Sequence, residues 1–505
     1  MDIKINKFEQ DVDSLINKMN IYKNNWNYLL QIIFTVFEYR VEKINHQKNS
    51  ESLFHTELTI LDRVIKLCSK HENETIRRDA DINKVNTFFE NVYKYLEIEN
   101  NFILSKNGYL NISIEKSNVY FTNIKIDETL EIINFYNKLN FAENYRHRFF
   151  KYSTNDTSHT ENLIKDFRKG IENIREYKEN FLLKNDIYIN EVYDIYAILI
   201  FFCSIIKNFN KFDDFIIEED KLLNRIRRIT KLDDNKIKDI LLLLSYETGQ
   251  KIDIIHTPLF HITDSDGNKC FITTPSLIIN SNIERNILVL IQEKLKIKPY
   301  DGLQEIIMCN HIKEKISCYD NLHITSNIKL LDKSKKIITD IDLLIFDDNT
   351  NSCICCELKN FLYADSLQQH LNIQGRKDDE QLNKAYEQVR LTKNYFGEDF
   401  DGIVAILKNR GISIDEKTKL EFIVVSSNNL GYYSKHNINI VDTNNFIDLC
   451  VSNAGDLQKV IKNIQQNIFS QNIHCDYICE DKKIEFAGYK ITYPYYYINH
   501  FGKVI

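Results

Sequence analysis

Two carboxylates and a lysine, Asp342, Glu357 and Lys359, are the residues whose types and spacing best suit chemistry. Asp342 lies in an apolar run, 339–346, and the other two residues end a second apolar run, 353–359. The short polar segment between the runs predicts a turn, so the runs should form adjacent antiparallel strands. Because alternate residues of a strand share a face, Glu357 and Lys359 should project together, roughly 6–7 Å apart, with Asp342 folded back beside them.

These residue types suit a hard divalent cation. Mg²⁺ prefers oxygen ligands and keeps several waters, so it needs only one or two protein carboxylates. Asp342 and Glu357 would supply the carboxylates, and the backbone carbonyl of Leu358 would be a third ligand. The cation would lower the pKa of a bound water and stabilise charge on a phosphate. Lys359 would orient or help deprotonate that water and contact the scissile phosphate.

The pattern D-x14-E-L-K that begins at Asp342 resembles the PD-(D/E)XK nuclease superfamily, over residues 281–430. This superfamily includes restriction endonucleases, Holliday-junction resolvases and many defence nucleases. The resemblance implies an α/β domain with a restriction-endonuclease-like αβββαβ core, a mixed sheet, Mg²⁺ or Mn²⁺ as cofactor, and phosphodiester hydrolysis. It favours DNA over RNA, because most members cut DNA. One position departs from the motif, since Ile341 stands where proline is expected.

Two helices expected beside these strands carry further candidate residues. The resemblance implies a glutamate of the first core helix near the metal, which points to Glu284 in 283–295, with Glu293 as a rival. It also implies a glutamine on the helix after the second strand. Gln381 and Gln388 are seven residues apart and share one helical face, so either is a candidate. That helix, 378–396, has an apolar face of Leu382, Ala385, Tyr386 and Val389.

The elements around the two strands indicate an α/β domain. Short β-branched runs alternate with helical segments from about residue 281 onward, which is typical of a mixed sheet covered by helices. A lone Glu-x-Lys triplet is more often a solvated strand edge, but a charged pair at the end of an apolar strand is costly without partners. The expected strand runs are 324–332, 335–348, 352–361, 402–408 and 421–427.

The chain is long enough for two or three domains. We expect a large, mainly α-helical N-terminal domain over 1–215, a transition segment with a helix and a hairpin over 216–280, the nuclease domain over 281–450, and a helix and strand extension over 451–505. More locally, the expected elements are helices at 24–44 and 55–71, a hairpin within 108–126, a buried helix at 195–206, and a hairpin at 260–274 with its turn at Asp266-Gly267.

Composition indicates a soluble globular protein, with 43% hydrophobic and 27% charged residues. The net charge of −7 argues against a tight non-specific DNA binder but allows a local basic groove. The first residues do not resemble a signal peptide, and the most apolar stretch, 195–206, is too short to cross a bilayer. We therefore expect a cytoplasmic protein with no membrane partner. A zinc site at His474, Cys475 and Cys479 would lack a second close pair of ligands.

Two basic segments are candidates for binding nucleic acid. Arg146 and Arg148 alternate with aromatic residues in 145–152, as in proteins that bind single strands. Arg225 and Arg228 belong to a second cluster of cations. Solvated helix faces are the alternative interpretation of both segments. The sequence has no glycine-rich phosphate-binding loop, which argues against an intrinsic ATPase.

Together these observations predict a divalent-metal-dependent nuclease, and more specifically an endodeoxyribonuclease. A nuclease joined to a helical module would suit restriction or anti-phage defence. One alternative is a catalytically silent nucleic-acid-binding or scaffold subunit. Another is an effector of a larger complex that a partner triggers, in which the helical N-terminal region binds a protein partner or forms a homo-oligomer.

Overall fold

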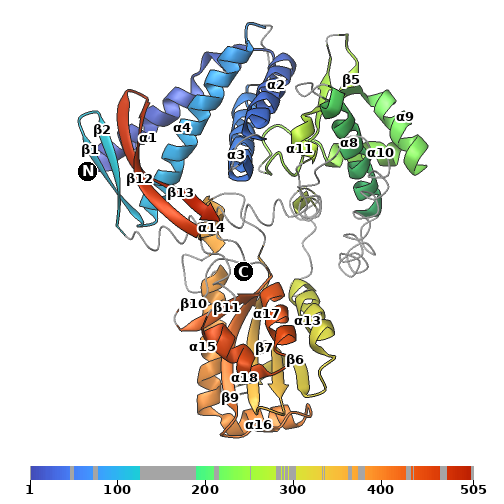
Figure 1. The fold of residues 1–505 in the computed structure, drawn as a ribbon, viewed down its shortest axis with the longest axis vertical. Helices are drawn as coiled ribbons and strands as arrows, with labels where there is room; N and C mark the ends of the chain where they lie inside the picture. Colours follow the sequence, from blue (N-terminus) through green and yellow to red (C-terminus); the bar gives the residue numbers. More distant parts are fainter. Residues whose placement is uncertain are drawn as a thin grey trace. The chain divides into compact units, whose positions relative to one another are not determined.

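The chain forms two compact units in the computed structural model (Figure 1). The first unit contains the described residues before Pro299 and Asp481–Tyr495, and the second contains those of Pro299–Glu480 and from Tyr496 onward. Both mix helices with strands, and the N-terminal region is helical, as expected. The structure describes residues 2–45, 50–71, 78–124, 189–209, 215–250, 252–264, 266–279, 303–331, 336–361, 367–373, 381–427, 434–435, 437–466 and 475–501, with isolated residues at 286, 289, 290, 294 and 334.

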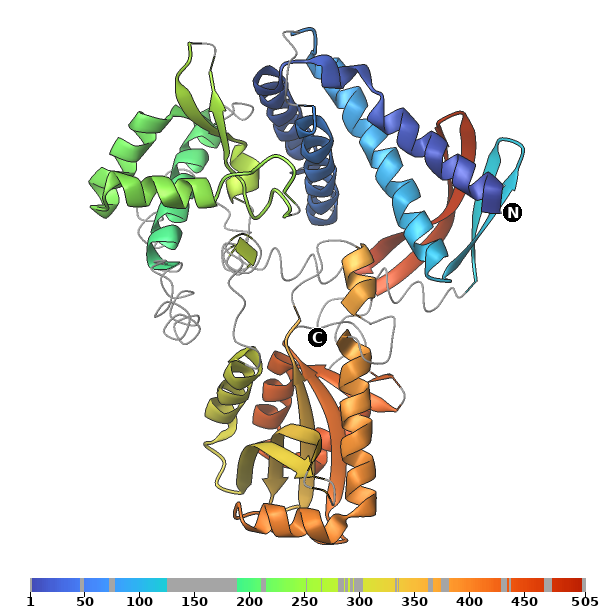
Figure 2. The same ribbon diagram turned by 180° about the vertical axis from the view of Figure 1, so that it is seen from behind.

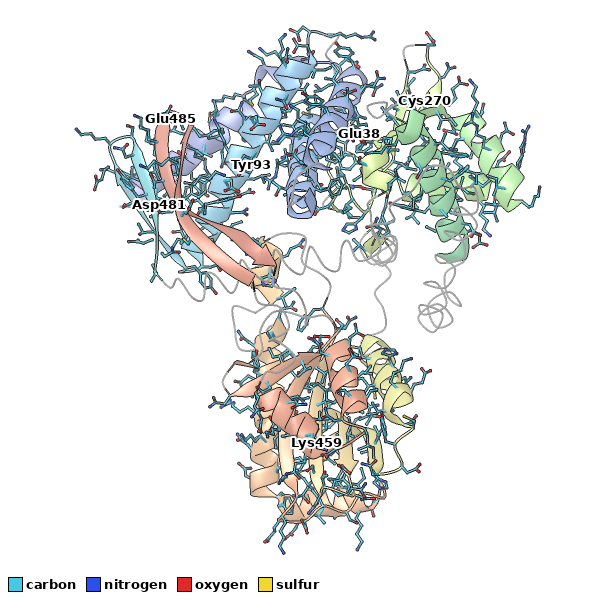
Figure 3. All side chains as sticks on the ribbon, viewed as in Figure 1. Glu38, Tyr93, Cys270, Lys459, Asp481 and Glu485 are labelled. Carbon is cyan, nitrogen blue, oxygen red and sulfur yellow. The ribbon has the colours of Figure 1, made fainter. Side chains whose placement is uncertain are left out.

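Long helices and a mixed sheet form much of the first unit. Their bounds are α1 (Asp2–Asn17), η1 (Asn20–Lys23), α2 (Trp26–Asn45), α3 (Ser50–Ser69), α4 (Ile82–Lys106), β1 (Leu110–Glu115), β2 (Asn118–Asn123), α8 (Ile189–Phe209) and α11 (Pro275–Ile279). The strands β12 (Cys475–Phe486) and β13 (Tyr489–Phe501) contribute their residues from Asp481 to Tyr495 to this unit. β1 and β2 form the expected hairpin, and β13 adds to β2 in parallel. Buried Glu38 of α2 (Figure 3) accepts hydrogen bonds from the N–H of Ser276 at 2.6 Å and from Lys207 Nζ at 3.1 Å, which ties α2 to α11 and α8.

A second group of elements in the first unit joins two short helices to a small antiparallel sheet. These elements are β3 (Phe215–Glu218), α9 (Glu219–Thr230), α10 (Asp234–Leu243), β4 (Phe260–Thr263) and β5 (Lys269–Thr273). The strand order is β3-β5-β4, and β4 and β5 form the hairpin expected at 260–274. Gly267 in its turn has φ +84°, a conformation that glycine adopts without a steric penalty.

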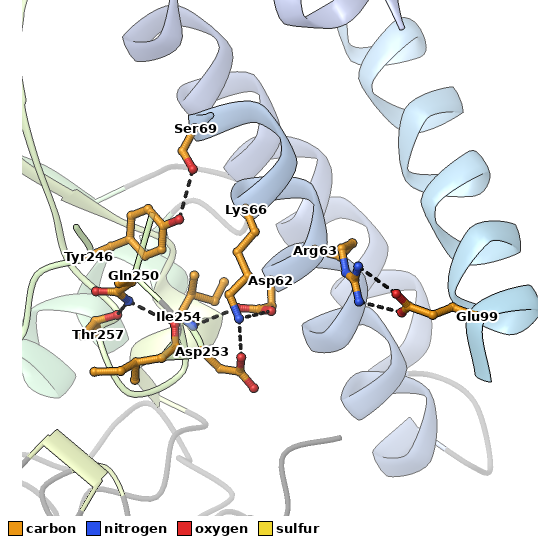
Figure 4. A network of polar contacts seen from close by, with 11 residues as sticks. Asp62, Arg63, Lys66, Ser69, Glu99, Tyr246, Gln250, Asp253, Ile254 and Thr257 are labelled. Carbon is orange, nitrogen blue, oxygen red and sulfur yellow. Dashed lines mark hydrogen bonds and ion pairs between the residues drawn. The ribbon is translucent and has the colours of Figure 1, made fainter. Parts of the chain in front are cut away.

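An ion cluster ties α3 to the loop that follows α10 (Figure 4). Lys66 Nζ lies 2.9 Å from Asp62 Oδ2 and also contacts the carboxylate of Asp253. Asp62 Oδ1 accepts a hydrogen bond of 3.0 Å from the N–H of Ile254. Burial and the neighbouring Asp253 raise the pKa of Asp62 to about 6, although Lys66 opposes the shift. One lysine therefore neutralises two partly buried acids.

Replacing this lysine, as in Lys66→Met, should lower the free energy of unfolding by about 2–4 kcal/mol at about pH 8, because two carboxylates would lose their counter-charge. The folded pKa of Asp62 lies above its unfolded value, so its ionisation costs stability as the pH rises through about 6. The loss should therefore be smaller at about pH 5, as measured by urea unfolding.

The control for this prediction is Lys221→Met, because the Lys221 ammonium pairs with Glu218 on the surface with 62% of its side chain exposed. Its free energy of unfolding should change by less than about 0.5 kcal/mol. Equal effects of the two substitutions would contradict the assigned role of Lys66.

A six-stranded mixed sheet of order β10-β11-β9-β8-β7-β6 organises the second unit. β6, β7 and β8 are antiparallel neighbours, whereas β8, β9 and β11 run parallel. β7 and β8 are the two strands expected to form a hairpin. The bounds in this unit are α13 (Leu303–Ile316), β6 (Leu322–Leu331), β7 (Ile337–Asp347), β8 (Ser352–Lys359), α14 (Leu367–Ile373), α15 (Gln381–Glu398), α16 (Phe400–Lys408), β9 (Lys419–Ser426), β10 (Ser434–Lys435), β11 (Ile438–Asp442), α17 (Thr443–Ser452) and α18 (Leu457–Gln465).

Helices cover both faces of this sheet, as Figure 2 shows for α13 and α15. Cys353 and Cys355 of β8 join a core with residues of α15 and α16. Ile354, Cys356 and Leu358 point to the other face and join a core with α13, α17 and α18. Because both faces are buried, β8 carries apolar residues at successive rather than alternate positions.

The helix before β6 differs from the sequence-based expectation. α13 immediately precedes β6 and packs against β6, β7 and β8, whereas 283–295 was expected in this place. The α/β unit also begins at Pro299 rather than at 281, and it takes in α17 and α18. Most of 283–295 lies outside the described residues, and its apolar periodicity carries no information about which sheet a helix there would cover.

The run 402–408, expected as a strand, belongs instead to α16. Asp399 caps this helix by accepting a hydrogen bond of 3.2 Å from the N–H of Gly402. Ile403 and Leu407 are buried at helical spacing, which a short apolar run does not distinguish from a strand. The stretch 195–206 lies in α8, and no helix among the described residues is long and apolar enough to cross a membrane.

Candidate active site

Asp342, Glu357 and Lys359 meet where β7 and β8 separate. The antiparallel register of the hairpin, continued one residue beyond its last pair, places Asp342 opposite Glu357. Beyond this point β7 continues to pair with β6. Asp342 Oδ2 accepts a hydrogen bond of 2.8 Å from the N–H of Leu358, and Lys359 Nζ lies 2.6 Å from Glu357 Oε1. The structure therefore brings together the three residues that the strand spacing predicts.

A cavity of about 310 Å³ opens beside these residues. The N–H of Leu358 points toward Asp342, and in a strand the carbonyl of the same residue lies on the same edge, so this carbonyl also faces the opening between β7 and β8. Glu357 and Lys359 line the cavity as well. Its other polar lining residues are Asn310 of α13, Ser326 and Asn327 of β6, Asp340 of β7 and Gln388 of α15.

The carboxyl group of Glu357 is held in an unfavourable electrostatic environment. Only 4% of the residue is exposed. Burial raises the pKa of Glu357 to about 8, the carboxylates of Asp342 and Asp340 also raise it, and Lys359 lowers it. A buried acid beside other carboxylates ionises readily only when a cation neutralises it. The site therefore favours the binding of positive charge.

We expect Glu357→Gln to stabilise the metal-free protein increasingly as the pH rises. The folded pKa of Glu357, about 8, exceeds its ordinary value of 4.5, so the wild type loses stability between these two pH values. The difference in free energy of unfolding should grow by about 2–4 kcal/mol from about pH 5 to about pH 9, measured by urea unfolding in EDTA. Asp348→Asn, at an exposed turn of the same hairpin, should show no such gain. A difference in the free energy of unfolding that does not change with pH would contradict the raised pKa of Glu357.

Of the two glutamines of α15, Gln388 lines the cavity. Its Oε1 is buried and has no hydrogen-bond partner among the described residues. Gln381 is the first residue of α15, is exposed, and lies two turns away from Gln388. The apolar face expected for this helix is confirmed, since Leu382, Ala385, Tyr386 and Val389 are all buried.

A kink in β6 shapes the wall of the cavity opposite Asp342. Ser326 and Ile328 pair with β7, but Asn327 between them has φ +54°, in the left-handed region. Arg410, just beyond α16, donates hydrogen bonds to the carbonyl oxygen atoms of Ser326 at 2.7 Å and of Asn327 at 3.2 Å. These bonds satisfy carbonyl groups beside the kink, and Asn327 is left lining the cavity.

The kink predicts unequal effects of two substitutions at Asn327. Asn327→Val should lower the free energy of unfolding by about 1–2 kcal/mol, because a β-branched residue is strained at positive φ. Asn327→Gly should change it by less than about 0.5 kcal/mol, because glycine adopts this conformation readily. Asn327 is exposed, so lost packing contributes little to either value. Urea unfolding measures both, and similar losses would contradict the left-handed conformation.

Several candidate residues lie elsewhere. Glu284 and its rival Glu293 lie outside the described residues, and so do Arg146, Arg148 and the potential zinc ligand His474. Arg225 and Arg228 are exposed on α9 of the first unit, and the cavity of the second unit does not include them.

The cavity contains three polar residues that were not expected there, Asp340, Asn310 and Asn327. Asp340 is two residues before Asp342, so the alternation of strand side chains could have placed it on the same face. Asn310 and Asn327 carry no local signal, because α13 and the kink of β6 bring them to the cavity only through tertiary packing.

Two carboxylates are the core of any metal site here. Among the described residues, no group of three or more His, Cys, Asp or Glu side chains is arranged to hold a metal ion. Further oxygen donors would therefore be the Leu358 carbonyl or the Gln388 amide. Comparisons of the chain with protein-family models, with curated proteins and with solved structures gave no match. The function is therefore inferred from the geometry of the site.

Proposed function

We propose that the second unit hydrolyses phosphodiester bonds in nucleic acid, DNA rather than RNA, with Mg²⁺ or Mn²⁺ as cofactor. The convergence of Asp342, Glu357 and Lys359 at a cavity where β7 leaves β8 carries this proposal. The element order supports it, because α13, β6, β7, β8, α15 and β9 follow the αβββαβ order of the resembled nuclease superfamily, with α14 and α16 as additional helices before and after α15. A role in restriction or anti-phage defence stays a prediction from that resemblance.

The donors at the cavity fit a hard divalent cation. Asp342 and Glu357 offer carboxylate oxygens, the Leu358 carbonyl lies on the same edge, and the buried Gln388 Oε1 is without a partner among the described residues. Mg²⁺ accepts such a small protein set because it retains several waters. When bound, the cation would supply positive charge that polarises the phosphate and acidifies a water.

We assign to Lys359 the role of acting on the attacking water. Its Nζ pairs with Glu357, its side chain is 21% exposed, and both residues line the cavity. With a cation held by Asp342 and Glu357, the Lys359 ammonium would be available to contact the phosphate or to orient the water. Hydrolysis adds the water oxygen to phosphorus, breaks one P–O bond and delivers a proton to the leaving oxygen. Lys359 would relay that proton or stabilise the negative charge on the leaving oxygen.

The full-length protein should cleave supercoiled plasmid, linear duplex or single-stranded DNA with Mg²⁺ or Mn²⁺, and EDTA should stop the reaction. Glu357→Gln and Lys359→Met should each lower the cleavage rate by at least about 10²-fold, because one removes a carboxylate ligand and the other the ammonium. Initial rates from gel assays measure the effect, with single-stranded and duplex RNA included as competing substrates.

Asp348→Asn is the matched control, since it removes an exposed carboxylate of the same hairpin and should keep wild-type activity. Undiminished cleavage by both site variants would refute the assignment. A folded wild type that binds Mn²⁺ in calorimetry but cuts nothing would favour an effector that waits for a partner. A protein that neither binds nor cuts would favour the silent nucleic-acid-binding or scaffold subunit.

A further inference from the structure

The described elements from α8 to β5 form a helix–turn–helix followed by a hairpin (Figure 1). The turn 231–233 joins α9 to α10, and the order β3-β5-β4 brings the strand before α9 beside the hairpin. One core holds the group together, since Leu222 of α9, Leu241 of α10 and Phe271 of β5 are fully buried. This is the element order of a winged helix–turn–helix, a module that many proteins use to bind DNA.

A row of cations follows the exposed face of α9. Lys221, Arg225 and Arg228 are all exposed and stand at i, i+4 and i+7, so they share one side of the helix. Leu223 and Ile226 are buried on the opposite side. The row is about 10 Å long, a length over which one DNA strand carries about three phosphates. Its spacing therefore matches a phosphate backbone.

The partners of this row can be exchanged. Lys221 pairs with Glu218 at 2.5 Å, but both side chains are exposed, by 62% and 42%. Such exposed pairs contribute little to stability, so a phosphate can replace the carboxylate. The guanidinium of Arg225 lies 5.7 Å from the ring centre of Phe202, a contact that leaves its N–H groups able to donate outward.

The second helix of the pair does not offer such a row. Asp234 and Asp239 are exposed on α10, whereas Lys236 pairs with Glu191 and Lys238 pairs with Glu219. In helix–turn–helix proteins the second helix reads bases in the major groove, while the first crosses the backbone. The charges here therefore favour contact through α9 and the backbone, without base readout by α10.

We propose that the row formed by Lys221, Arg225 and Arg228 is a nucleic-acid-binding site that binds DNA phosphates independently of base sequence. This site is additional to the proposed hydrolysis, because the row lies on the first unit and DNA can bind to it without the cavity or a metal. Its action would be to hold the substrate by its backbone, and the affinity should depend steeply on salt.

The test measures binding of the full-length protein to a short fluorescein-labelled DNA duplex by fluorescence anisotropy in EDTA. The triple substitution Lys221→Gln, Arg225→Gln and Arg228→Gln should weaken binding by more than about tenfold at about 50 mM salt. The slope of log K against log salt should become shallower by about 2–3, because each lost phosphate contact contributes about 0.9. A duplex of scrambled sequence should bind equally well.

Arg227→Gln is the matched control on the same helix. Its guanidinium donates to Asp234 at 2.9 Å and to Asn224, and its side chain lies about 100° around the helix from Arg228 and off the row, so Arg227→Gln should change affinity less than about twofold. Arg228→Gln, which removes the same charge one residue away, should change it more. Equal losses in these two single variants would overturn the site, and so would unchanged binding by the triple variant.

Two further results would also overturn it. A large difference in affinity between the two duplex sequences would show that the protein contacts bases rather than phosphates alone. Anionic lipid vesicles that compete as well as DNA would reassign the row to a membrane surface. Because EDTA suppresses metal-dependent cleavage, the binding result is independent of whether the cavity cuts DNA, so each proposal can fail without the other. The triple variant should unfold at the same urea concentration as the wild type, because all three residues are exposed.

Discussion

The hydrogen bond from the N–H of Leu358 to Asp342 is the interaction on which the candidate site depends. It satisfies a backbone donor at the point where β7 leaves β8, so the strands can part without an orphaned N–H. It also holds the Asp342 carboxylate beside Glu357. The separation of the strands opens the cavity, and the same bond that permits the separation positions an acid at its edge.

The burial of β8 explains why the site has unusual electrostatics. Helices cover both faces of the strand, so Glu357 is desolvated although it stands beside other carboxylates. Burial raises its pKa, and Lys359 offsets only part of that cost. A charged group that lowers stability in this way persists more readily where it has a function. The left-handed conformation of Asn327, beside which Arg410 binds the backbone, is a second uncommon feature at the same cavity.

The two units offer opposite charges to the nucleic acid that we propose as their ligand. The cavity of the second unit gathers oxygen donors and carboxylates, which suit a cation and repel phosphate until that cation is bound. The exposed cations of α9 in the first unit attract phosphate directly. A net charge of −7 is compatible with both, because a local row of cations acts within a Debye length of about 8–10 Å.

The sequence by itself determined the β7–β8 hairpin, the shared face of Asp342, Glu357 and Lys359, and the apolar face of α15. Turn residues, the two-residue period of strands and the 3.6-residue period of helices are local patterns, so these features can be predicted without knowledge of the tertiary fold. Only the tertiary structure decided that α13 covers the sheet, that 402–408 is helical, and that Gln388 lies at the cavity. Only the tertiary structure decided, too, that Asn310 and Asn327 line this cavity. Those outcomes depend on packing between segments distant in sequence, which no local pattern encodes.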